Sequence, residues 1–214
     1  MNLGSFDVNS SGSQSFGGFV PVWMPQVQIG VLPGGGNLVS DYIVANSLIP
    51  AGTPIYQASI GGDQTPLEVF ELAADVSTAD TSISVKGGSL GTVPTTDHVF
   101  MVCPASGVTG KAASPSAVAA IDSSGNYVMT FTADDLGAAS EGDYLVLAAE
   151  AGSGKSMLAP ANGLNLHDAY LGEYPTNVHL TVVDEGAILE DRTPAIIPAN
   201  IKSILTNVKF RKEL

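Results

Sequence analysis

The sequence is poor in positive charge. It holds 8 lysine and arginine residues against 21 aspartate and glutamate residues in a chain of 214, which gives a formal net charge of −13. Such an acidic chain repels phosphate backbones, so the sequence argues against nucleic acid as a partner. Charged residues of both signs make up only 14% of the chain, well below the roughly 25% of an average domain.

Cysteine and long apolar runs are also scarce. The single cysteine, Cys103, excludes an intramolecular disulfide framework and lies in the apolar run VFMVC, where we expect a buried small hydrophobe rather than a reactive thiol. No run of about 18 apolar residues is present, so the sequence predicts no transmembrane helix and no membrane partner. These features indicate folding in a reducing cytoplasm.

Turn-forming residues and short apolar segments are abundant. With 24 glycines, 13 prolines and 44% apolar residues, the composition predicts a mainly β fold with many turns. The segments HVFMVC (98–103) and NVHLTVVD (177–184) read as strands, and SAVAAIDSSGNYVMTFT (116–132) reads as a hairpin. One or two short helices are expected, at 132–139 and at 196–210, where Ile201, Ile204 and Leu205 follow a helical spacing.

The two ends of the chain differ from its middle. From Arg192 onward the sequence carries five of its eight basic residues and one acid, Glu213. We interpret this tail as a protein–protein contact, because its apolar residues need a protein surface to pack on. Residues 1–18 form a flexible Gly/Ser-rich arm with Phe6 and Phe16. The arm is either a plain disordered terminus or a tether that pairs with a neighbouring chain.

Few segments point to chemistry. AEAGSGKS (149–156) fits a loose nucleotide-binding pattern with Lys155, but Pro160 and Gly163 exclude the helix that must follow a phosphate-binding loop. His98, His167 and His179 lack metal-ligand spacing. No nucleophile motif is present either. We therefore expect no enzyme, no cofactor and no metal site.

A series of segments carries a resemblance to a known family. In chain order they are LIPAGTPIYQ (48–57), ELAADVSTADTSISVKGG (71–88), the block 116–148, the block 155–194 and IIPANIKSILTNVKF (196–210). Taken in this order, they resemble the head fiber and capsid decoration proteins of tailed bacteriophages. The resemblance covers roughly residues 40–210 and rests on the order of the segments more than on single residues.

The resemblance implies an architecture. A small β-barrel or tulip-like capsid-proximal domain would comprise residues 19–66 and 151–214, and it would end in a basic helix and strand. An inserted β-sandwich-like domain would comprise residues 67–150 and project outward.

The resemblance also implies a role. The chain would be a non-enzymatic virion protein that decorates the capsid surface, assembled in the cytoplasm of a bacterial host. Its partners would be the major capsid protein and further copies of itself, with a trimer favoured. The expected interface residues are Phe6, Phe16, Arg192, Lys202, Lys209 and Arg211.

Two other functions stay open at this point. One is a phage tail or surface adhesion module that recognises a host or environmental glycan through the segment 67–150. The other is nucleotide hydrolysis at Lys155. Trp23, in VPVWMP, is expected in the core rather than as an exposed anchor.

Overall fold

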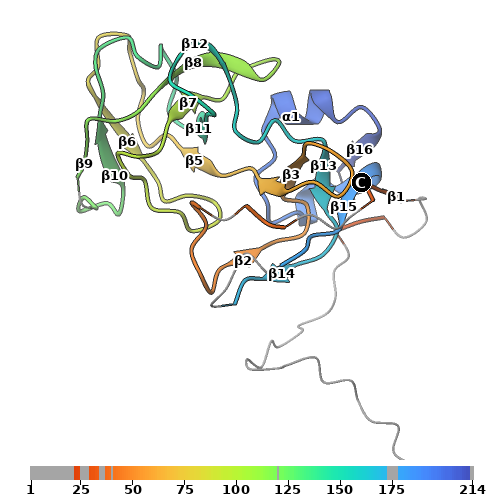
Figure 1. The fold of residues 1–214 in the computed structure, drawn as a ribbon. Coiled ribbons are helices and arrows are strands. Elements are labelled where there is room, and N and C mark those ends of the chain that lie inside the picture. The colour runs from red at the N-terminus through yellow and green to blue at the C-terminus, as the bar shows by residue number, and fades with distance from the viewer. Residues whose placement is uncertain are drawn as a thin grey trace, which may run out of the picture.

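Strands dominate the protein. The computed structural model describes residues 22–24, 29–33, 37–39, 41–119, 121–172 and 178–212 (Figure 1). Strand accounts for 37% and helix for 5% of the structure, so the predicted mainly β class is confirmed. The helical elements of the described part are the 3-10 turn η2 (Glu190–Arg192) and the helix α1 (Ala199–Ile204).

The described strands form four sheets. The largest has the order β1-β15-β13-β3-β4, with β16 also paired to β15. Its strands are β1 (Gly30–Val31), β15 (Val182–Leu189), β13 (Gly163–Asn165), β3 (Pro54–Gln57), β4 (Gln64–Pro66) and β16 (Val208–Arg211).

A second sheet has five strands in the order β12-β8-β7-β11-β5. They are β12 (Gly152–Ser156), β8 (Thr109–Ala113), β7 (Phe100–Val102), β11 (Tyr144–Leu147) and β5 (Val69–Glu71). The smaller sheets are β6 (Ser82–Val85), β10 (Tyr127–Thr130) and β9 (Ala117–Ala119), in the order β6-β10-β9, and the pair β2 (Leu48–Ile49) with β14 (Ala169–Tyr170).

The expectation of a closed barrel is wrong for the described residues, because none of their sheets closes on itself. In the largest sheet, β1 and β4 are the strands that would have to meet. Leu38, a few residues beyond β1, reaches Gln64 of β4 by a single parallel bridge instead of a strand ladder. Pro33 lies between β1 and Leu38 in the sequence, and proline has no N–H with which to continue a ladder of hydrogen bonds.

The helix expected at 132–139 is also absent. In its place, residues 133–136 form a turn and a bend, and Ala139 forms an antiparallel bridge with Val76 through two backbone hydrogen bonds. The Asp135 side chain accepts a hydrogen bond from the Thr132 N–H at 3.0 Å. Aspartate competes in this way with helical hydrogen bonding, which favours a turn.

The strands β5, β7 and β11 of the five-stranded sheet are covered on both faces, whereas the edge strand β12 is largely exposed. Neighbouring residues on its strands point to opposite sides, so Phe100 packs in one hydrophobic cluster and Met101 in the other. Strand β11 alternates in the same manner, with Leu145 and Val146 in different clusters. A strand covered on both faces needs a continuous apolar run, which explains the runs FMVC and YLVLAA.

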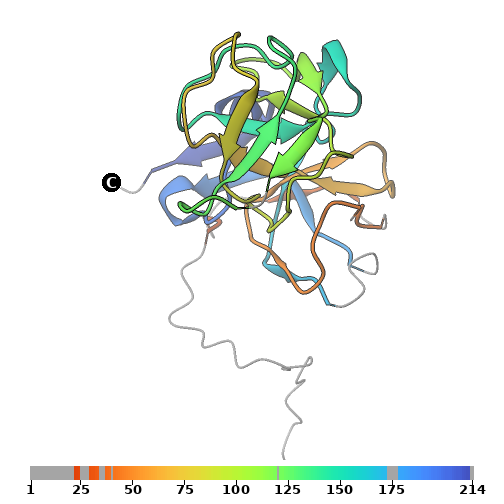
Figure 2. The same ribbon diagram turned by 90° about the vertical axis from the view of Figure 1, so that its left-hand side faces the viewer.

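The segment 67–150 supplies the strands β5 to β11. Figure 1 shows β6, β9 and β10 at the left-hand side and β1, β15 and β16 at the right, and Figure 2 shows the molecule from the side of β6, β9 and β10. One strand from beyond this segment, β12, joins its sheet through β8. Both hydrophobic clusters contain residues from 67–150 and from the rest of the chain, so the two regions share their core.

The ring of Phe100 is central to one cluster. It is fully buried and makes edge contacts with Phe70 and Phe131, with ring centroids 5.3 and 6.4 Å away. We expect Phe100→Ala to lower the free energy of unfolding by about 3–5 kcal/mol in denaturant titration, because a large cavity would remain. Ile60→Ala is the control, since Ile60 is 80% exposed. A Phe100→Ala loss as small as that of the control would contradict this assignment.

Candidate docking surface

The two described ends of the chain meet on strand β15. Trp23 forms an antiparallel bridge with Ile188, and Phe210 lies beside Ile188 in the parallel register of β16. The backbone N–H of Met24 donates to the Ala187 carbonyl at 3.0 Å. We call the surface made by residues 22–24, 186–189 and 208–212 the docking end.

Trp23 is a core residue, as the sequence predicts. Its side chain is 6% exposed and packs in the cluster that contains Ile188 and Ile201. The strand beneath it carries Gly186, and a Cβ placed on that glycine would lie 3.3 Å from the Trp23 ring. A glycine within the strand therefore leaves room for the indole.

The cationic tail packs against the body of its own chain. Ile201 and Leu205 are buried at 0% and 5% exposure, which confirms that the helix α1 docks on a protein surface. Ile204, the third residue of the expected apolar stripe, is 37% exposed and so is not part of the contact.

A buried asparagine fixes this helix, and sequence reasoning missed it. Asn200 is 1% exposed, its Nδ2 donates to the Gly107 carbonyl at 2.9 Å, and its Oδ1 accepts from the Cys103 thiol at 3.2 Å. These partners lie at the end of β7 and in the loop that follows it, so Asn200 ties the tail to the segment 67–150. The sequence offers no signal for this contact beyond a polar residue in an apolar helix.

Two of the expected interface cations contact the chain itself. Lys202 Nζ lies 3.1 Å from the Glu190 carboxylate and 5.8 Å from the centroid of the Phe210 ring. Arg192 is half-buried at the end of η2 and is also engaged in an interaction. The structure thus gives Lys202 a role in holding the tail, whatever else it contacts.

Lys209 and Arg211 lie differently. They alternate along β16 with Val208 and Phe210 and point away from the core, and exposed Lys212 follows them. Within the part of the chain that the structure describes, no ion pair involves these three bases, whereas Lys86, Lys111 and Lys155 each pair with an acid, namely Glu71, Asp134 and Glu150. The exposed cationic row is therefore Lys209, Arg211 and Lys212. Phe6 and Phe16 lie outside the described residues.

The other candidates of the sequence do not converge. Lys155 lies on the antiparallel edge strand β12 and pairs with Glu150 at 2.5 Å, in a hairpin instead of a loop that opens a helix. His98 packs by its ring edge on Phe100, and burial lowers its pKa while Asp97 raises it. In the described ranges, no three His, Cys, Asp or Glu side chains lie where they could hold a metal ion.

No helix among the described residues has the length and apolar character needed to cross a membrane. Comparisons with protein-family models, with curated proteins and with solved structures found no match for this chain. The expected family and its implied functions therefore stay predictions.

Asn200→Ala should weaken the docking of the tail. Because the substitution leaves the Gly107 carbonyl and the Cys103 thiol without their partner, we expect the free energy of unfolding to fall by about 1–3 kcal/mol. Amide hydrogen exchange in 199–211 should also accelerate. Asn207→Ala is the matched control, because the Asn207 side chain is exposed. Equal exchange in both variants would show that Asn200 does not hold the tail.

The Cys103 thiol should be unreactive in the folded chain. Burial raises its pKa to about 12, the Asn200 hydrogen bond opposes this shift, and Asp143 adds to it. The thiolate fraction at neutral pH then falls by roughly a thousandfold against an ordinary thiol. Alkylation with iodoacetamide, followed by mass spectrometry, should be slow until denaturant is added. Rapid alkylation of the folded chain would refute this assignment.

Proposed function

We propose that this chain is a non-enzymatic structural protein of a tailed-bacteriophage virion, which decorates the capsid surface by binding the major capsid protein. The family resemblance of the segments between residues 40 and 210 motivates the proposal. One geometric observation supports the proposal: the two ends of the described chain meet beside Ile188.

This convergence supports attachment by one end of the molecule. The arm 1–18 precedes Trp23 along the chain, and the cationic row lies on β16 and on Lys212 just after it, so both expected docking elements adjoin the docking end. The strands β6, β9 and β10 lie at the opposite side (Figure 1). An attached molecule would therefore present the segment 67–150 away from the shell.

Charge supports the same orientation. Ahead of Arg192 the chain has three lysines and twenty acids, so an acidic coat surface would repel most of the molecule. Lys209, Arg211 and Lys212 provide an attractive contact on the docking end. Complementary charge of this kind orients an encounter and opposes wrong approaches more than it adds affinity.

Self-association, with a trimer favoured, forms part of the proposal. The pair β2–β14 exposes Leu48 and Tyr170, at 40% and 59%, and these residues are register partners. Val44 nearby in sequence is 45% exposed. Apolar side chains gathered at an exposed strand pair are typical of a protein contact.

Cosedimentation with particles of the virus that encodes the chain tests the proposal. We expect the full chain to bind, and deletion of residues 1–18 to weaken binding. The double variant Lys209→Glu/Arg211→Glu should lower affinity by about tenfold or more, an effect that shrinks as salt is raised.

Lys155→Glu is the matched control, because it makes a charge reversal of the same kind on β12. Failure of the full chain to bind the particles would overturn the proposed function. Binding that survives both the deletion and the double reversal would instead overturn only the docking end as the site of attachment. Glycan binding without particle binding would favour the adhesion module.

A further inference from the structure

Glu68 is a buried acid with no cation beside it. Its side chain is 1% exposed, and no ion pair within the described residues includes it. It lies between β4 and β5, directly before Val69, where the segment around Tyr42 and the loop 88–92 come together. An ionised carboxylate is costly to bury without a cation, so the stability of this region depends on whether Glu68 carries a proton.

The hydrogen bonds of Glu68 are divided unequally between its two oxygens. Oε1 accepts from the Leu90 N–H at 2.9 Å and from the Ser89 hydroxyl at 3.1 Å. Oε2 makes a short contact with the Thr92 hydroxyl. Oε1 thus has the surroundings of a carbonyl oxygen, and the side chain that Oε2 contacts is a hydroxyl, which can either donate or accept.

The Thr92 hydroxyl has another acceptor. Its Oγ1 lies 2.7 Å from the backbone carbonyl of Tyr42, and no backbone N–H in the described part of the chain serves that carbonyl. A hydroxyl carries one hydrogen and cannot donate to both oxygens. The Tyr42 carbonyl has no hydrogen to give, so only the Glu68 carboxyl can supply the second one.

We propose that Glu68 is protonated in the folded chain and acts as a proton-operated latch. Its Oε2–H donates to Thr92, and the Thr92 hydroxyl donates to the Tyr42 carbonyl. When Glu68 releases this proton to solvent, the Thr92 hydrogen turns to the carboxylate and the Tyr42 carbonyl is left buried without a donor. The latch joins the loop 88–92 to the segment 41–43.

The surroundings of Glu68 agree with this arrangement. Burial raises the pKa of its carboxyl, against hydrogen bonds from Thr92, Leu90, Ser89 and Val69 that lower it. Burial also raises the pKa of the Tyr42 phenol, so this neighbour adds no charge of its own to the site. Glu71, three residues further along the chain, is paired with Lys86 at 2.5 Å, and this lysine therefore does not neutralise Glu68.

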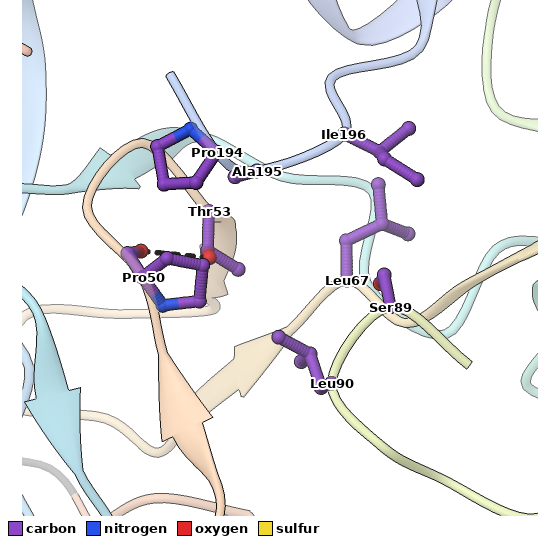
Figure 3. Close-up of a pocket in the computed structure, with 8 residues that line it drawn as sticks. All are labelled: Pro50, Thr53, Leu67, Ser89, Leu90, Pro194, Ala195 and Ile196. Carbon is purple, nitrogen blue, oxygen red and sulfur yellow. Dashed lines mark hydrogen bonds between the residues drawn. The ribbon is translucent and has the colours of Figure 1, made fainter. Parts of the chain in front are cut away.

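The latch controls one wall of a groove. A hollow of about 100 Å³ lies between the loop residues Ser89 and Leu90 and the tail residues Pro194 to Ile196, with Leu67 at its floor (Figure 3). Gly88 lets the loop come this close, because a Cβ there would lie 2.6 Å from Glu68 Oε1. Loss of the proton would therefore loosen the wall that faces the tail.

The sign of the pH dependence tests the latch. A carboxyl whose folded pKa is raised stabilises the fold below its unfolded pKa, and this stability is lost as pH rises through the folded value. As pH rises from about 4, the ordinary glutamate pKa, towards the raised pKa of Glu68, we expect the denaturation midpoint of the wild type to fall, because Glu68 loses its proton. Hydrogen exchange at 88–92, corrected for its intrinsic pH dependence, should rise in parallel.

Glu68→Gln keeps the geometry of the protonated acid, so it should hold the loop closed and remove this part of the pH dependence. Glu71→Gln is the control and should leave the wild-type profile in place. Thr92→Val should open the loop at every pH, because it removes the shared hydroxyl. Two results together would overturn the proposal. One is a denaturation midpoint of the wild type that rises with pH and loses this rise in Glu68→Gln, and the other is a Glu68→Gln variant less stable than the wild type. Both would show that Glu68 is ionised in the folded chain.

Discussion

The pairing of strand β15 with its neighbours is the constraint on which the rest of the structure depends. Its first residues pair with β1 on one side and β13 on the other, and its last residues pair with Trp23 and β16. Gly186, Ala187 and Ile188 are successive buried residues, so this part of the strand is covered on both faces, which explains why they are small or apolar. The termini, the basic tail and the core of the largest sheet are therefore positioned together.

The five-stranded sheet extends this arrangement to the segment 67–150. Residues on the two faces of this sheet pack in different hydrophobic clusters. Separation of the segment from the rest of the chain would therefore expose both clusters to water. Asn200 adds a polar contact at the same boundary. The segment 67–150 and the docking end are thus held by one shared core, which would keep their relative orientation fixed.

The sequence predicted those elements whose pattern is local. The hairpin at 116–132 appears as β9 and β10 around the turn at Asp122, because alternation and turn residues specify it without distant contacts. The strand expected at 177–184 instead runs as Val182–Leu189. Its glycine and acids look like a turn in isolation, and the strand continues because Gly186 to Leu189 pair with β16 and Trp23 packs over Gly186.

The polar contacts were beyond the reach of sequence reasoning. Glu68 meets a partner 24 residues away and Asn200 meets one 97 residues away, so neither leaves a pattern at fixed spacing. The tail was predictable in part, since the burial of Ile201 and Leu205 follows from helical periodicity. Which of its cations stay exposed depends on where Glu190 and Phe210 lie, and that is a property of the fold.

The parallel pairing of β16 with β15 has a mechanical consequence. Four residues of β16, from Val208 to Arg211, are in register with four residues of β15. A pull along the axis of β16 strains these pairs together in shear, whereas a pull across the strands would separate them one after another. A molecule anchored through its C-terminal strand and dragged by fluid flow along that axis would resist detachment of the strand most strongly.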